Sequence, residues 1–224
     1  SQVYVAHIIC DMLNALKSND YLASYEDIKI EQEAVEDYKR NNYATGECVY
    51  KLCKMLKSFF YNDYQDVLRT ALEPNFKNQM LEDGTYGEVV YYLISSLSIY
   101  SIAKKNRPRG CKSFLKISHK MLNEMKKVCP LNFLALWSLL EAEKARENND
   151  FKLAVSRYEM AISEAYNANL FLWEIIATER TSLYYEVMGL SKLNEVYSQE
   201  AHYAYQRWGI NCKKTGGVLH TYFN

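Results

Sequence analysis

The sequence predicts an all-α protein built from antiparallel helix pairs, and three observations predict it. First, apolar residues recur at intervals of three and four over most of the 224 residues, which is the period of a helix with one buried face. Second, the chain holds only three prolines and eight glycines, as long helices joined by short turns require. Third, no stretch of useful length shows the two-residue period of a β-strand. We expect about ten helices.

The first 128 residues are predicted to hold degenerate helical repeats. Residues 2–18 and 21–41 have the apolar stripes of two amphipathic helices. A strongly apolar helix over 49–60 follows, and Asn62-Asp63 begins a shorter partner over 64–72. We interpret these last two segments as an early, degenerate repeat.

The next segments lead to a predicted boundary at Cys129-Pro130. Residues 82–87 are predicted to be a loop. The helix over 89–104 is apolar nearly all round, which favours burial between neighbours. Arg107-Pro108 is predicted to start another helix, because proline suits the first helical turn. Pro74 is expected to interrupt or kink the helix before the loop.

Residues 129–210 carry the clearest pattern, two helix pairs in succession. In the first pair, Asn148-Asn149 separates the helices and Asp150 is a good N-cap for the second helix. Two antiparallel helices approach closely only where side chains are small. The small, small, aromatic and small places of a tetratricopeptide-type repeat are filled by Ala142, Ala154, Tyr158 and Ala161.

The second pair repeats this plan less faithfully. The helix Leu170–Met188 is expected to end at Gly189, and Ser191 is expected to cap the next helix, which runs to Trp208. Ala161 and Ala201 occupy equivalent places, which gives a local period of 40 residues, against about 34 for an ordinary unit. Asn194 and Ser198 replace the small and aromatic residues of the pattern. The fold expected is a stacked α-solenoid, with residues 211–224 as a tail.

These two pairs resemble the helical-repeat region that follows the ATPase domain in large multi-sensor hybrid histidine kinases and related serine/threonine kinases. The resemblance covers about the last 80 residues and departs at Ile210 and after Lys214. It rests on Cys129-Pro130, Asn132-Phe133, Leu140-Glu141-Ala142-Glu143, Ala145-Arg146, Glu200-Ala201, Tyr205 and Arg207-Trp208-Gly209. It implies a segment of a signal-transduction protein that contacts neighbouring ATPase, kinase and sensor domains, and it implies no catalytic residue here.

Composition bounds the expected partners and location. Lys+Arg and Asp+Glu both total 27, so no overall attraction to nucleic acid or to an anionic membrane follows. The longest apolar run, Val89–Ile102, is broken by serines and is too short to span a bilayer. We therefore expect no nucleic-acid and no membrane partner. Without a signal peptide or a disulfide-like cluster, a cytoplasmic location is expected. The start at Ser1 favours a fragment.

No motif predicts a catalytic, cofactor or metal site, and we expect no enzyme. The six cysteines and the scattered histidines have no zinc-ligand spacing, so each cysteine is expected to be a small buried apolar residue. No triad spacing appears, although an enzyme site assembled in space remains a minor alternative. Gly84–Gly87 lacks the lysine and the preceding strand of a phosphate-binding loop.

Two charged clusters have two interpretations each. A basic cluster can hold a phosphate or an acidic partner, but we favour a solvated loop between helices. It comprises Lys104, Lys105, Arg107, Arg109 and Lys112. An acidic cluster can do acid–base work or hold a divalent metal, but a solvated helix face is the favoured interpretation. It comprises Glu141, Glu143 and Glu147.

The leading hypothesis is a non-catalytic helical-repeat scaffold, and the alternative is a self-contained peptide- or protein-binding module. Modules that clamp a peptide carboxylate place Lys and Asn on their first helices. Those places here are held by Leu139, Glu143, Glu179 and Leu183, so no such clamp is expected. A weak homo-oligomer is expected through the N-terminal apolar stripe. That stripe comprises Val5, Ile8, Met12 and Leu16.

Overall fold

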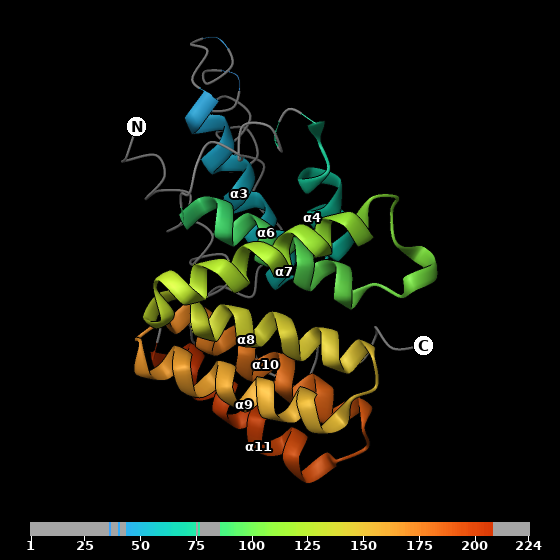
Figure 1. The fold of residues 1–224 in the computed structure, drawn as a ribbon, viewed down its shortest axis with the longest axis vertical. Helices are drawn as coiled ribbons and strands as arrows, with labels where there is room; N and C mark the ends of the chain where they lie inside the picture. Colours follow the sequence, from blue (N-terminus) through green and yellow to red (C-terminus); the bar gives the residue numbers. More distant parts are fainter. Residues whose placement is uncertain (1–35, 37–39, 41–43, 75, 77–85, 208–224) are drawn as a thin grey trace. The chain divides into compact units, whose positions relative to one another are not determined.

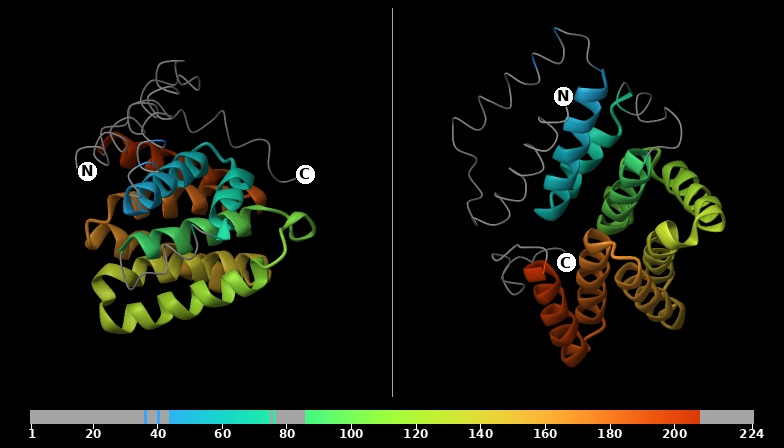
Figure 2. Two further views of the ribbon diagram at one scale, coloured as in Figure 1. Left: turned by 90° about the horizontal axis from the view of Figure 1, so that it is seen from above. Right: turned by 90° about the vertical axis from the view of Figure 1, so that its left-hand side faces the viewer.

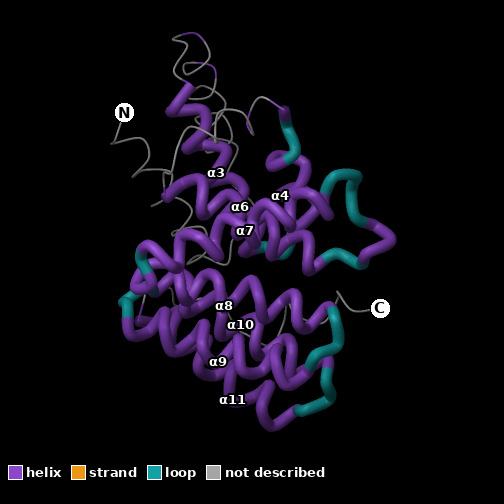
Figure 3. The backbone as a smooth tube through the Cα atoms, in the orientation of Figure 1, coloured by secondary structure: helices purple, strands orange, loops and turns teal. Residues whose placement is uncertain are grey.

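The computed structural model describes residues 36, 40, 44–74, 76 and 86–207 (Figure 1). Over these residues the chain forms helices and connecting loops and no strand, which confirms the all-α prediction (Figure 3). Eight α-helices and one 3-10 helix are described, so the expected total of about ten includes segments outside the described residues. The N-terminal stripe on 2–18, Trp208 and the tail 211–224 also lie outside them.

The chain divides into two compact units, Ser1–Ile102 and Ala103–Asn224. The expected boundary between residues 128 and 129 separates irregular from regular repeats. The predicted boundary marks a change in the regularity of the repeats, whereas the observed one separates two compact units. The predicted boundary therefore stays a prediction. The described part of the first unit contains α3 (Ala44–Phe60), α4 (Tyr64–Ala71) and α6 (Tyr86–Ser101), each packed against the other two.

Helix α6 is the core of the described part of the first unit. Twelve consecutive residues, Val89–Tyr100, are buried, as its apolar sequence predicts. Tyr91 donates a hydrogen bond of 2.8 Å from its hydroxyl to the carbonyl of Ala71, the last residue of α4. The serines on α6 satisfy their hydroxyls within the helix, since Ser95 and Ser98 donate to the carbonyls four residues earlier.

The second unit begins with a 3-10 helix, η1 (Lys104–Asn106), and then five long helices follow. These are α7 (Cys111–Val128), α8 (Pro130–Glu147), α9 (Phe151–Asn167), α10 (Phe171–Val187) and α11 (Ser191–Arg207). Helix α7 packs on α8, α8 on α9, α9 on α10 and α10 on α11, so neighbours in sequence are neighbours in space (Figure 2).

One turn geometry joins the helix pairs. Its central residue has a positive φ, where Asn and Gly are the residues least strained: Asn62 (61°), Asn149 (59°), Asn169 (55°) and Gly189 (71°). The next residue donates its N–H to a carbonyl five positions earlier, as Asp150 does to Ala145 at 2.9 Å. Helices α9, α10 and α11 have 17 residues each and are joined by three-residue turns. The 40-residue spacing of Ala161 and Ala201 is therefore two helix-turn units of equal length.

Several predicted boundaries are wrong. Helix α7 begins at Cys111, after Gly110 in the left-handed region, and not at Arg107-Pro108. Arg107 is extended, as the residue before a proline prefers, and residues 107–110 form a loop and turn ahead of α7. Helix α6 begins at Tyr86, inside the predicted loop, and ends at Ser101 rather than at 104. Ser191 lies inside α11, because Asn194 donates its N–H to the carbonyl of Leu190.

The helix pairs themselves fall where the sequence predicts. Ala142, Ala154, Tyr158 and Ala161 are all buried between α8 and α9, and Asp150 caps α9 by accepting the N–H of Leu153 at 3.1 Å. Gly189 ends α10 in the left-handed region, as expected. Helix α4 ends at Ala71, shortly before Pro74, which confirms the predicted interruption.

Candidate functional site

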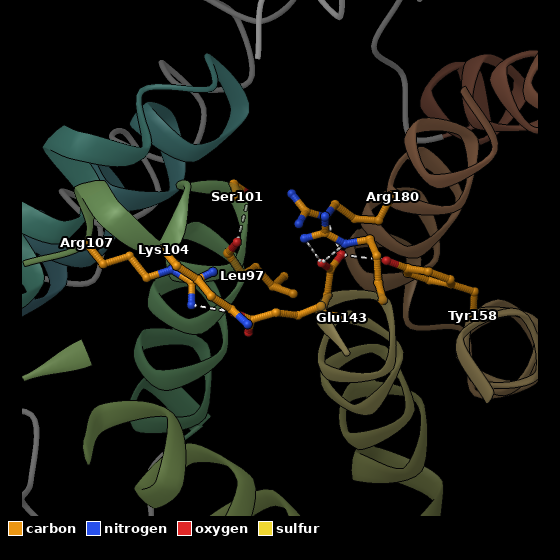
Figure 4. A network of polar contacts seen from close by, with 9 residues as sticks. Leu97, Ser101, Lys104, Arg107, Glu143, Tyr158 and Arg180 are labelled. Carbon is orange, nitrogen blue, oxygen red and sulfur yellow. Dashed lines mark hydrogen bonds and ion pairs between the residues drawn. The ribbon is translucent and has the colours of Figure 1, made fainter. Parts of the chain in front are cut away.

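Glu143 lies at the centre of a buried polar cluster formed by three helices of the second unit (Figure 4). Its side chain points from α8 between α9 and α10 and is 0 % exposed. Tyr158 approaches it from α9 and Arg180 from α10, while Arg146 comes from the next turn of α8. We call these four residues the Glu143 cluster.

Both oxygens of the Glu143 carboxylate are fully used. Oε1 accepts the Tyr158 hydroxyl at 2.9 Å and Arg180 Nε at 2.6 Å. Oε2 accepts Arg146 Nε at 2.9 Å and its Nη2 at 2.8 Å. A buried ion pair stabilises a fold only when its remaining hydrogen-bonding capacity is met, and here that condition is satisfied.

The charges of the cluster fix its protonation. Burial alone would raise the pKa of the Glu143 carboxyl. The charges of Arg146 and Arg180 outweigh that effect and, with the hydrogen bonds, lower the pKa to about 2. Burial, followed by the negative charge of Glu143, raises the pKa of the Tyr158 hydroxyl well above its usual value. The carboxylate is therefore charged and the phenol neutral across the physiological pH range.

This arrangement corrects the interpretation of Glu143. The sequence places Glu143 and Glu147 on a solvated face, but Glu143 is buried and Glu147 is only partly exposed. The signal that sequence reasoning missed is Arg180, a cation in the middle of the mostly apolar helix α10. A buried guanidinium requires a carboxylate partner, and Glu143 with Tyr158 supplies one.

The basic cluster is divided in its roles. Lys104 Nζ and Arg107 Nη1 both bind Oε1 of Glu147, at 3.2 and 2.8 Å, which ties η1 and the following loop to the end of α8. Lys105, Arg109 and Lys112 are exposed. Two of the five predicted cations thus serve the fold, and three remain at the surface.

A second set of contacts joins α7, α8 and α9. Lys126 Nζ lies 2.8 Å from the centroid of the Trp137 ring, and the Arg157 guanidinium carbon lies 4.6 Å from it, so the indole receives cations from two helices. Burial and then the charge of Arg157 lower the pKa of Lys126. Nearby, His119 Nδ1 lies 2.7 Å from Glu141 Oε1 and links α7 to α8.

Helices α10 and α11 meet through polar groups. Ser182 donates its hydroxyl to Asn194 Oδ1 at 2.6 Å, at the places held by Ala142 and Ala154 in the preceding pair. Arg207 of α11 pairs with the carboxylate of Glu174, and Tyr197 donates to Glu159 of α9. The replacement of an alanine by Asn194 is therefore compensated by a hydrogen bond.

The cysteines and the peptide-clamp places are mostly buried in the described part of the chain. Cys48, Cys53 and Cys111 are buried and Cys129 is partly exposed, each as a free thiol; Cys10 and Cys212 lie outside the described residues. Of the peptide-clamp places, Leu139 and Glu143 are buried and Glu179 and Leu183 are partly exposed. Within 44–74 and 86–207, no three His, Cys, Asp or Glu side chains gather in a way that could hold a metal ion.

Comparison with protein-family models, with curated proteins and with solved structures finds no match to this chain. None of the described helices is both long and apolar enough to cross a membrane. A carboxylate that accepts four hydrogen bonds has no lone pair directed at a substrate, so the cluster joins three helices rather than moving protons.

Proposed function

We propose that this chain is a non-catalytic helical-repeat scaffold of the tetratricopeptide-like, α-solenoid type, which holds other proteins or neighbouring domains of a longer signalling chain. One observation carries the proposal: helices α9, α10 and α11 have equal length and follow one another through turns of one geometry. Such regular helix pairs are typical of proteins that present extended surfaces to partners.

The buried polar contacts support the same proposal. The Glu143 cluster links α8 and α9 to α10, and Glu159 and Glu174 link α9 and α10 to α11. Each helix pair is thereby fixed to the next by specific ion pairs and hydrogen bonds. A scaffold needs such fixed stacking, because its surface has a defined shape only when successive pairs keep one orientation.

A self-contained peptide-binding module is the second candidate. Its supporting observation is the half-exposed aromatic ring of Phe151, whose centroid lies 6.1 Å from that of the buried Tyr184 ring. Aromatic side chains on a solenoid surface are suited to hold peptides. The burial of Leu139 and Glu143 argues against recognition of a peptide carboxylate at the usual places.

Cross-linking in the native source distinguishes the two. A lysine-reactive cross-linker is applied to intact cells, and the peptides joined to Lys152 and Lys192, both exposed, are identified by mass spectrometry. Cross-links to other segments of one longer polypeptide support the scaffold within a signalling protein. Cross-links to a separate protein support the module. Cross-links confined to residues 1–224 of one chain contradict both.

A further inference from the structure

The excess of positive over negative charge in residues 103–207 lies mostly at one end of the second unit, although the whole chain is neutral. Three segments, 103–112, 147–153 and 186–195, meet there, and we call them the basic end (Figure 1). The first two are joined by the bonds of Lys104 and Arg107 to Glu147. The second is linked to the helix turn that leads into the third by Phe151, the first residue of α9, whose ring centroid lies 6.1 Å from that of Tyr184 in the last turn of α10.

Positive charge exceeds negative charge at the basic end. Its seven cations are Lys104, Lys105, Arg107, Arg109, Lys112, Lys152 and Lys192. Its four carboxylates are Glu147, Asp150, Glu186 and Glu195. The local excess is thus three positive charges, and Glu147 is already held by two of the cations. The zero net charge of the chain conceals this local field.

Large apolar side chains are exposed at the same place. They are Phe151, Leu153, Val187, Met188, Leu190 and Leu193, each between 38 and 50 % exposed. They occupy the first residues of α9, the last residue of α10, the α10–α11 turn and the first turn of α11. Lys152 lies between the first two, and Lys192 lies between Leu190 and Leu193.

The shape of the basic end favours one class of partner. Its apolar groups stand at the tips of two neighbouring helix hairpins, so they project from the bundle rather than line a groove. A helical peptide docks into a groove, whereas projecting apolar tips flanked by lysines suit a flat interface with water on one side. The lysine stems can lie along the apolar surface while their ammonium groups reach anionic headgroups.

We infer that the basic end binds the surface of an anionic lipid bilayer, with the first turn of α9 and the α10–α11 turn entering the interface. The apolar tips enter the headgroup region, and the exposed cations contact the anionic lipids. This attachment is peripheral and reversible. Membrane attachment goes beyond the scaffold role and does not depend on it. The attachment uses the helix turns, and the scaffold role depends on the faces between helix pairs.

Vesicle sedimentation tests the inference with the whole chain. The protein is mixed with vesicles of phosphatidylcholine alone or with about 30 % phosphatidylserine, at low and high salt. We expect sedimentation only with the anionic vesicles, and a several-fold loss at high salt because the exposed charges are screened. No sedimentation with anionic vesicles, or equal binding to neutral ones, overturns the inference.

Two pairs of variants locate the contact. Met188→Ser with Leu190→Ser removes apolar tips and is expected to lower the partition coefficient about tenfold. Its matched control, Val128→Ser with Leu131→Ser, removes side chains that are 86 and 68 % exposed at the opposite end of the helices and should leave binding unchanged. Lys152→Glu with Lys192→Glu is expected to lower binding tenfold or more, by an estimate of about fivefold for each lost cation.

The control for charge is Lys54→Glu with Lys116→Glu, which changes the net charge equally at exposed positions outside the basic end. Circular dichroism is recorded for every variant to check that it is folded. The salt dependence of binding is measured on the parent chain and needs no variant. Equal losses in variants and controls contradict the assignment. Failure to bind vesicles, together with cross-links from Lys152 and Lys192 to a protein, overturns it in favour of a protein partner.

Discussion

The α8–α9 pair and the α10–α11 pair share one backbone plan but are held together by different chemistry. In the first, Ala142 and Ala154 are buried, and the adjacent Glu143 carries charge into the interior. In the second, Ser182 and Asn194 share a hydrogen bond at the same places. The turns fix the period, and the helix faces then accept either apolar or polar contacts.

The largest difference should appear at the buried carboxylate. Glu143→Ala leaves Arg146 and Arg180 without their shared anion, so we expect a loss of about 3–5 kcal/mol in the free energy of unfolding, measured with urea. The control Glu195→Ala removes an exposed carboxylate from α11 and should change the free energy by less than about 0.5 kcal/mol. Equal effects would show that the cluster is not an anchor of the fold.

Acid should destabilise the second unit through the same carboxylate. The pKa of Glu143 is lowered to about 2 in the folded chain from an ordinary value of 4.5. Its contribution is therefore complete above pH 4.5 and is lost as the pH falls towards 2, at up to about 1.4 kcal/mol per pH unit. Denaturation at several pH values should show this slope in the parent chain. The slope should be reduced in Glu143→Gln, and an unchanged slope contradicts the assignment.

Over-packing sharpens the comparison of the two pairs. Ala154 is fully buried, so Ala154→Leu forces a larger side chain into a packed interface. This should cost about 1–3 kcal/mol in unfolding free energy. Asn194→Leu, at the equivalent and partly exposed place, loses a hydrogen bond but can direct its side chain outwards. We expect its thermal midpoint to fall less than that of Ala154→Leu. The reverse order would contradict the looser packing around Asn194.

A double-mutant cycle tests whether the second pair can be converted to the first. Ser182→Ala and Asn194→Ala should each cost about 0.5–1.5 kcal/mol, because each leaves a polar partner with its hydrogen bond unmade. The double variant restores an alanine pair and should cost less than the sum of the two single variants. Strict additivity would mean that the 2.6 Å contact does not contribute to stability.

The smallest expected effect has the opposite sign. The Ser138 hydroxyl on α8 is fully buried and has no hydrogen-bond partner in the described part of the chain. Ser138→Ala removes this unpaired group and should raise the unfolding free energy by a few tenths to about 1 kcal/mol. Ser163→Ala, at an exposed position of α9, serves as control and should change the unfolding free energy little. A loss of stability in Ser138→Ala would reveal a partner for the hydroxyl.

The sequence predicts the helices of the second unit better than their contacts. Spacing alone locates α8 to α11, because Asp150 and Gly189 mark turns by local rules that need no partner. The burial of Glu143 depends on Arg180, which is 37 residues away, so no local pattern contains it. The sequence does not locate the start of α7, because Pro108 is compatible with either a helix start or an extended loop. The structure has the extended loop.

The equal length of the helix-turn units has a consequence for how this chain can change by duplication or deletion. Helices α9, α10 and α11 begin at residues 151, 171 and 191. Removing the 20-residue unit of α9 would reverse the direction of α10 and α11 relative to α8, and Arg180 would then no longer reach Glu143. Removing or copying 40 residues would keep both direction and register. A chain of this kind can therefore lengthen only in steps of two helices.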